Sequence, residues 1–404
     1  MRRAVWLLAL GASRAAALLT AVKGSSKADV VAPDLEQKAT KVKGILNFME
    51  LHSDEPDAVA VACSRLGGEA YNGGRAVQDL VVLLGGVQAC IGALRSHVNH
   101  SGVVQSCGSG LGGVIVFNNL ACKVSAALGG IEALAAGIRA HEDERKVMLT
   151  IDVFSSHCDL NPENRPRVRQ AGGIDLILES MRRFYSDGEV QFKNWAGLSA
   201  TVHDPENREA IARGSGWCPP GCGAGELRGI ELLVQTMRDL RSSHRVNQEA
   251  MQVAKGLLDH SAEYRDALVE AGLIAEIVKT VREREREELG TPCVGAEALT
   301  KLALMNPGYR VRIALSGVVS DIVRAMQNRL TPDSTNYGGS TNADVWPTLS
   351  SGCRFLEVMA GDLMARETLT TDSGAMSLVS NLASAGQSAA IRSACNATLG
   401  QLTV

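Results

Sequence analysis

Residues 161–183 read NPENRPRVRQAGGIDLILESMRR, and this stretch decides the fold. Proline directly after Asn161 is a standard helix start, because the first turn of a helix does not need the missing N–H. Gly172 and Gly173 end that helix and begin another, since glycine can take the left-handed conformation that caps a helix. After the turn, apolar residues stand at i, i+3, i+4 and i+7, which places them on one helix face. The stretch therefore predicts two helices joined by a glycine turn.

The apolar set after the turn recurs along the whole chain. Its eight copies begin at Val42, Val87, Ile131, Ile174, Ile230, Ile274, Val319 and Ala375. The intervals between these residues are 45, 44, 43, 56, 44, 45 and 56. Each of the two long intervals contains an insertion rich in Gly, Pro and Ser, at 214–225 and at 331–345, with the chemistry of a loop. Without the insertions the period is uniform, which predicts stacked helical repeats.

An arginine and an aliphatic residue three positions later precede the turn in several copies. The pairs are Arg165/Val168, Arg265/Leu268, Arg310/Ile313 and Arg366/Leu369. With this element the chain resembles the armadillo family over roughly residues 40 to 400. The resemblance implies an all-α, right-handed α-solenoid of about seven to eight repeats, in which the helix after the glycine turn is a long third helix lining a concave groove. We expect an N-terminal segment at 1–39, either a targeting sequence or a capping helix, and the solenoid at 40–404.

Five consecutive copies carry arginine eight residues after the first apolar position. This arginine ladder consists of Arg95, Arg139, Arg182, Arg238 and Arg282. A polar residue follows the first apolar position in four of these copies, at Gln88, Glu132, Asp175 and Glu231. We predict that the ladder grips an acidic, extended segment of a partner through charge-assisted hydrogen bonds. The alternative is helix electrostatics, since acids favour helix starts and bases favour helix ends.

Composition restricts the function and the compartment. The net charge of −3 gives no reason to expect a nucleic-acid partner. Ten cysteines are scattered through apolar stretches, which predicts buried free thiols and a cytoplasmic location. Against that location, Arg2, Arg3 and the apolar run from Ala4 to Ala12 have the pattern of a signal or transit peptide, although the run is too short to span a membrane.

Three segments resemble catalytic or ligand sites, and we expect none of them to be one. The run from Gly108 to Gly113 has dinucleotide-type spacing but lacks the strand that such a site needs. Cys218 and Cys222 form a two-cysteine loop, which leaves a metal site, a local disulfide or an ordinary loop open. The alternating charges of residues 282–288 indicate a solvated helix end.

Together these features predict a non-enzymatic scaffold or adaptor without a cofactor, monomeric, with a protein partner held along the groove. A structural subunit of a larger assembly is the alternative. An enzyme with its site at the Cys218–Cys222 loop is the third hypothesis.

Overall fold

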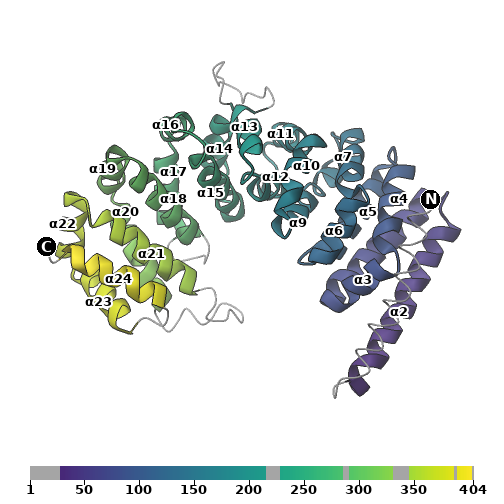
Figure 1. The fold of residues 1–404 in the computed structure, drawn as a ribbon. Coiled ribbons are helices and arrows are strands. Elements are labelled where there is room, and N and C mark those ends of the chain that lie inside the picture. The colour runs from purple at the N-terminus through teal and green to yellow at the C-terminus, as the bar shows by residue number, and fades with distance from the viewer. Residues whose placement is uncertain (1–27, 215–227, 285–290, 331–344, 386–388, 403–404) are drawn as a thin grey trace. The chain divides into compact units, whose positions relative to one another are not determined.

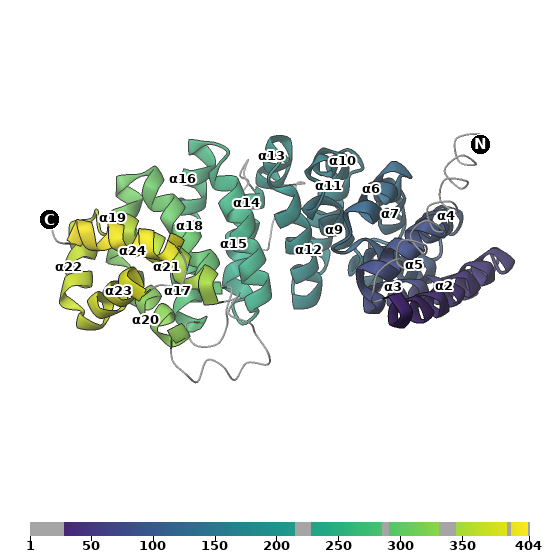
Figure 2. The ribbon, with the colours of Figure 1, turned by 60° about the horizontal axis from the view of Figure 1, so that its bottom comes forward.

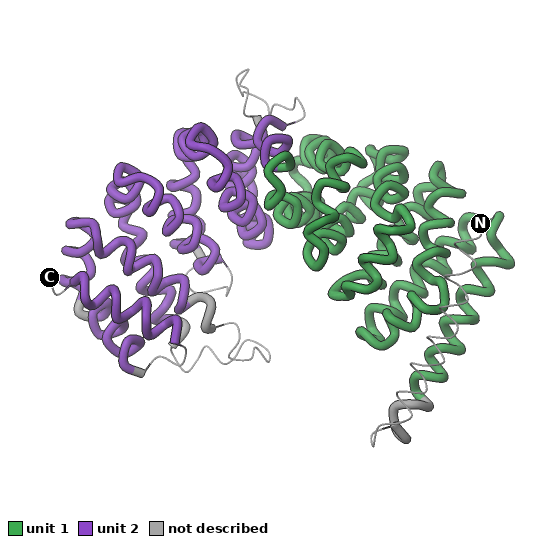
Figure 3. The backbone as a smooth tube through the Cα atoms, viewed as in Figure 1, with its two compact units in different colours: residues 1–207 green, residues 208–404 purple. Residues whose placement is uncertain are grey.

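The computed structural model describes residues 28–214, 228–284, 291–330, 345–385 and 389–402. In these ranges the chain forms helices and no strands, as predicted (Figure 1). It divides into two compact units, residues 1–207 and 208–404, and the boundary falls inside helix α13 (Pro205–Arg213) (Figure 3). The predicted insertions at 214–225 and 331–345 lie almost wholly outside the described ranges.

The apolar sets form the helices that follow the glycine turns. These helices are α4 (Gly86–Ser96), α7 (Gly130–Ala140), α11 (Gly173–Arg183), α14 (Arg228–Asp239), α17 (Leu273–Arg284), α20 (Val318–Leu330) and α23 (Ser373–Ala385). The predicted stripe is buried: in α11, Ile174, Ile177, Leu178 and Met181 are at most 1 % exposed. Gly129 and Gly172 adopt φ of +78° and +77°, the left-handed conformation that the sequence predicted.

A shorter helix precedes each of these turns. The set is α6 (Asn119–Ala127), α10 (Arg165–Gln170) after the 3₁₀ turn η1 (Pro162–Asn164), α13 (Pro205–Arg213), α16 (Ala262–Glu270), α19 (Pro307–Leu315) and α22 (Leu363–Thr371). The earliest copy is the second half of α3 (Pro56–Leu83), which Gly74 interrupts with φ +65°.

The helix after the glycine turn is not the long third helix that we expected. It has 11–13 residues, and another helix of 14–15 residues follows it in most repeats. These long helices are α5 (Ser101–Ile115), α12 (Gly188–Thr201), α15 (His244–Leu258), α18 (Thr291–Met305), α21 (Val345–Met359) and α24 (Ala389–Leu402). One repeat has α8 (Arg145–Met148) and α9 (Val153–Asp159) instead. The separate long helix was not predicted because it is buried on several sides, so its apolar residues recur less regularly than those of the helix after the turn.

Successive long helices pack against each other within each unit. In unit 2, α15, α18, α21 and α24 lie side by side in that order (Figures 1 and 2). In unit 1 the first half of α3 packs along α5, and α5 contacts α9, which contacts α12. Helix α2 (Ala28–Leu51) packs on α3 and crosses the boundary expected at residue 39. Each unit therefore has a layer of long helices beside a layer of helices that follow the turns.

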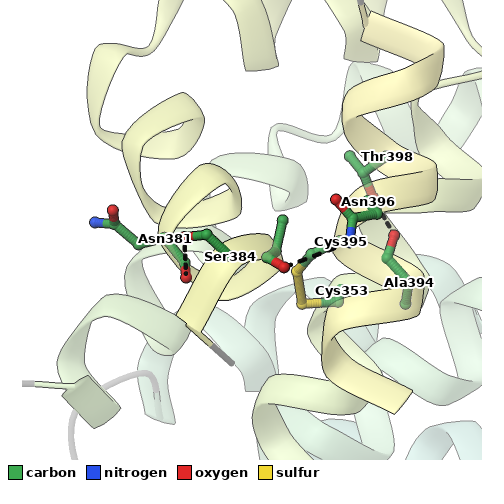
Figure 4. The surroundings of a disulfide bond; sticks show 8 residues. Cys353, Asn381, Ser384, Ala394, Cys395, Asn396 and Thr398 are labelled. Carbon is green, nitrogen blue, oxygen red and sulfur yellow. Dashed lines mark hydrogen bonds between the residues drawn. A yellow bond between two sulfur atoms is a disulfide. The ribbon is translucent and has the colours of Figure 1, made fainter. Parts of the chain in front are cut away.

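Four of the cysteines are not the free thiols that we predicted. Cys63 pairs with Cys107, and Cys353 with Cys395 (Figure 4), whereas Cys90, Cys122, Cys158 and Cys293 are buried thiols. The paired residues are 44 and 42 positions apart, one repeat period. Stacking places such residues side by side, with Cα atoms 4.8 and 5.2 Å apart, which is within the range for a disulfide. Cys218 and Cys222 lie outside the described residues.

Candidate partner-binding surface

The arginine ladder lies at the ends of the helices that follow the turns, and its side chains are exposed. Arg95 donates through Nη2 to the carbonyls of Leu128 and Gly129, at 2.7 and 3.3 Å. Arg139 donates to the carbonyl of Ala171 at 3.2 Å. Both arginines therefore reach the glycine turn of the following repeat.

The carbonyls that these arginines reach belong to helix ends. Leu128 and Ala171 are the C-cap residues of α6 and α10. The last carbonyls of a helix have no partner inside it, and cations near them are favoured by the helix dipole. A Cβ on Gly129 would lie 2.4 Å from Nη2 of Arg95. Gly129 therefore has two roles in the turn: it permits the left-handed backbone, and it leaves space for the Arg95 guanidinium.

The ladder continues in unit 2 with an acid added. Arg282 donates to the carbonyl of Ser316, the C-cap residue of α19, at 3.2 Å and to Asp321 Oδ2 at 3.0 Å. Arg238 donates to Glu276 Oε1 at 3.3 Å, and Arg241 donates to Glu276 Oε2 at 3.0 Å. The Asp321 and Glu276 side chains are only 3 % exposed.

Arg182 differs from the other ladder members. Among the described residues its recorded bonds go to Glu179, one turn earlier on its own helix. Four of the five arginines thus connect one repeat to the next; for Arg182, whose following turn lies outside the described residues, the structure shows only the bonds to Glu179. We conclude that the arginine ladder joins adjacent repeats. Helix electrostatics alone did not predict this role. Binding of a partner by the ladder stays a prediction.

The polar residues predicted beside the ladder have different environments. Glu132 accepts two hydrogen bonds from Arg167, at 2.6 and 3.0 Å. Burial alone would raise the pKa of Glu132, but the bonds from Arg167 and its charge lower that pKa below its ordinary value. Gln88 and Asp175 are exposed, and Glu231 is half-buried. These four residues lie on four different helices, α4, α7, α11 and α14.

The sequence analysis missed the role of the second arginine series. Arg310 donates to the carbonyl of Ala303 at 3.3 and 3.2 Å, and Arg366 donates to that of Ala360 at 3.1 Å. These carbonyls lie at the ends of the long helices α18 and α21. The fixed spacing of arginine before an aliphatic residue indicates the repeat, and it could also have indicated this shared role of the arginines.

A groove of about 440 Å³ lies on the long helices of unit 1. Its lining comes from α3, α5, α9 and α12 and the chain beside them: Ser64, Gly67, Gly68, Tyr71, Ser109, Gly110, Gly112, Gly113, Val116, Leu149, Asp152, Val153, Ser156 and Lys193. No ladder arginine is among them. The groove is therefore on the layer of long helices, while the ladder is on the other layer.

Glycines form the floor of this groove because two helices cross closely there. A Cβ on Gly67 would lie 2.4 Å from the Cα of Gly110, and one on Gly113 would lie 2.6 Å from the carbonyl of Gly67. Gly110 and Gly113 belong to the run that has dinucleotide-type spacing. The run is inside helix α5, as expected, and it serves helix packing instead of a phosphate turn.

Polar groups surround the glycine floor. Lys193 on α12 pairs with Asp152, which precedes α9. The Tyr71 side chain is 63 % exposed. Serine hydroxyls from three helices and this ion pair could hydrogen-bond a backbone laid across the glycines.

The long helices of unit 2 carry further polar pairs. Lys301 on α18 pairs with Asp259 at 2.6 Å, and Lys255 on α15 pairs with Glu297 on α18. Ser351 on α21 donates to Glu297 Oε1 at 3.0 Å. Burial alone would raise the pKa of Glu297, but Lys255 and the hydrogen bonds lower it overall. The carboxylate therefore stays ionised within a network that joins three successive helices.

Across the described ranges, no group of three or more His, Cys, Asp or Glu side chains could hold a metal ion. Burial raises the pKa of Cys90 and of Cys158 to about 12, which leaves little reactive thiolate at neutral pH.

Within the described part of the chain, no single helix has the length and hydropathy for a membrane span, although two helix pairs, bent by 69° and 71°, have them jointly.

Similarity searches give structural matches only. No family model and no curated protein matches the chain. An engineered protein solved by the Northeast Structural Genomics Consortium superimposes with a TM-score of 0.60 at 18 % identity, covering 96 % of this chain and 98 % of that one. A second engineered protein from the same consortium gives 0.51 at 15 % identity, covering 67 % and 98 %. A designed armadillo repeat protein gives 0.48 at 14 % identity, covering 64 % and 94 %.

The repeat has the order of an armadillo unit: a short helix, a glycine turn, a second helix and a longer one. The chain has an armadillo-like repeat fold.

Proposed function

We propose that this chain is a non-enzymatic scaffold that holds an extended segment of a partner protein on its long helices, in the groove of unit 1. The observation that supports this most directly is the groove itself, a 440 Å³ hollow with a floor of glycine and serine. Because glycines lack side chains, a partner backbone can approach the helices closely. An armadillo-like fold offers such an extended surface, since each repeat contacts only its neighbours and leaves one side of the array free.

A groove-filling substitution tests this proposal. Gly68 lies on α3 in the groove, is exposed, and a Cβ there would meet nothing within 4 Å. Gly400 on α24 is also exposed and equally open, and it belongs to the other unit. Gly68→Trp should therefore fill the groove without disturbing the core, and Gly400→Trp is its matched control.

The measurement has two steps. Proteins captured from a cell extract by the wild type and by each variant are identified by mass spectrometry, and the affinity of the identified partner is then measured by calorimetry. We expect Gly68→Trp to weaken binding about tenfold or more, or about 1.4 kcal/mol, with Gly400→Trp unchanged. Equal affinity for all three proteins would contradict binding in the groove.

The acidic partner segment predicted for the ladder needs a separate experiment. Arg182 suits it best, because within the described part of the chain it bonds only to Glu179 on its own helix, so that a change there opens no inter-repeat contact among the described residues. If the ladder grips acids, Arg182→Glu should weaken capture of an acidic partner at unchanged thermal stability. Unaltered capture would limit the ladder to joining repeats.

The proposal includes a monomeric state. Light scattering on the purified chain distinguishes it from a structural subunit of a larger assembly. A folded monomer at micromolar concentration supports the scaffold, whereas a chain that aggregates unless co-expressed with another protein supports the subunit.

A further inference from the structure

The two disulfides have the same place relative to the repeats. Cys63 and Cys107 join α3 to α5, and Cys353 and Cys395 join α21 to α24 (Figure 4). Each bond links consecutive long helices, since α3 supplies its first half as the long helix before Gly74. The first bond lies in the first such pair of the described chain, and the second bond lies in the last pair.

Each disulfide joins two helices that already pack on each other, α3 on α5 and α21 on α24. The contact of α3 with α5 includes a close approach of the two backbones at Gly67 and Gly110. A covalent bond between such helices limits how far they can separate when the structure opens locally.

The cysteines of the intervening helices stay reduced. Cys122, Cys158 and Cys293 lie between the two disulfides in the sequence, Cys90 lies on α4 within the segment closed by Cys63–Cys107, and all four are buried thiols. Burial raises the pKa of Cys90 and Cys122 to about 12 and 11, which disfavours the thiolate that disulfide exchange requires. Among the described residues, cross-linking is thus confined to the α3–α5 pair and the α21–α24 pair.

We propose that the protein matures in an oxidising compartment, where the disulfides Cys63–Cys107 and Cys353–Cys395 lock consecutive long helices together. Structural disulfides persist in such compartments and are rare where glutathione keeps thiols reduced. The signal-like sequence at Arg2, Arg3 and Ala4–Ala12 agrees with export. This inference replaces the cytoplasmic location expected from the scattered cysteines, and it does not depend on the proposed partner groove.

The oxidation has a defined balance. One cysteine thiolate attacks the disulfide of an oxidised dithiol carrier, which breaks the carrier S–S bond and forms a mixed disulfide. The second cysteine thiolate then attacks the protein sulfur of that mixed disulfide and expels the carrier thiolate. For each bond formed, two electrons and two protons pass from the cysteine pair to the carrier, which leaves as a dithiol.

Thiol mapping is the first test. The full chain is isolated from the cells that make it, with iodoacetamide present from lysis and no reductant, and is then denatured and digested. We expect a Cys63–Cys107 linked peptide and a Cys353–Cys395 linked peptide, with Cys90, Cys122, Cys158 and Cys293 alkylated. Alkylation of the four cysteines Cys63, Cys107, Cys353 and Cys395 would overturn the proposal.

Hydrogen exchange tests the lock itself. After reduction, amides in α3, α5, α21 and α24 should exchange about 30- to 700-fold faster, the range for a typical structural disulfide, while α11 and α17 stay unchanged. Cys63→Ala with Cys107→Ala should reproduce the change in α3 and α5 without reductant, and Cys122→Ala should not. If the double variant does not fold, the comparison of oxidised with reduced wild type still decides. Equal exchange in those two states would refute the lock.

Discussion

A buried histidine should make unit 1 sensitive to acid. His157 on α9 is fully buried; its Nδ1 donates to the carbonyl of Val153 at 2.9 Å, so its Nε2 accepts from the Ser125 hydroxyl at 2.9 Å. Burial lowers the pKa of His157 from 6.5 to about 4, and the bond to Val153 opposes this only in part. The neutral ring is therefore a condition for the native packing of α6 on α9.

The sign and size of the effect follow from that pKa. Between pH 6.5 and about 4 the unfolded chain binds a proton at this residue and the folded chain does not, so stability falls as the pH falls through this window. A shift from 6.5 to about 4 corresponds to a loss of about 3 kcal/mol, complete near pH 4. Such a loss is a large part of the stability of an ordinary domain.

The assay compares three proteins over a pH series. The free energy of unfolding is measured by urea titration between pH 7.5 and 4.5, and hydrogen exchange of α6 and α9 confirms that the change is local. His157→Gln cannot take up the proton, so it should be less stable than the wild type at pH 7 and should lose that disadvantage toward pH 4.5. His52→Gln makes the same change at a residue outside the core. Its free energy of unfolding should vary with pH in the same way as that of the wild type.

Parallel curves for the wild type and His157→Gln would refute the reasoning, because they would show that the buried ring contributes no proton linkage.

Three further predictions concern the contacts between repeats. Arg95→Ala should lower the free energy of unfolding by about 1 kcal/mol, because it leaves carbonyls at a helix end unpaired. Arg182→Ala should lower the free energy of unfolding by about 0.3–0.5 kcal/mol, which is typical of an ion pair within one helix. If urea titration gave equal losses for Arg95→Ala and Arg182→Ala, the inter-repeat role of Arg95 would be contradicted. Glu276→Gln should lower the free energy of unfolding by about 2 kcal/mol at pH 7. This loss is smaller than that expected for a fully buried ion pair, because the cationic partners of Glu276 are partly exposed. The charge of Glu276 stabilises the fold above its ordinary pKa of 4.5, and this contribution is lost as the pH falls through the lower folded pKa. The variant and the wild type should therefore converge in acid. Gly172→Ala should cost about 1–2 kcal/mol through its left-handed backbone, whereas Gly188→Ala, where a Cβ meets open space, should be neutral or stabilising by calorimetry.

The repeat could be predicted from the sequence because its signal is local. A glycine turn followed by apolar residues at helical spacing fixes both the helix end and the buried face, and the residues involved are within eleven positions of each other. The period then followed from counting. The long helices were missed because the face of α12 or α18 is buried against several neighbours, so its apolar residues do not form one narrow stripe.

The partners of particular side chains could not be predicted in the same way. Arg139 and Ala171 are 32 positions apart, and Arg282 and Asp321 are 39 apart; the repeat period relates such segments but does not say which of their side chains meet. The same holds for the groove, whose glycines on α3 and α5 meet only because those helices cross closely.

By itself the sequence determined the helices after the turns, the left-handed glycines and the register of the arginine ladder, because backbone preference and helical period act over a few residues. Only the tertiary structure decided that the ladder joins repeats, that glycines of α3 and α5 form a groove, and that four of the cysteines pair. The physical reason is that stacking brings together residues about one repeat apart, and each contact then depends on how two helices cross.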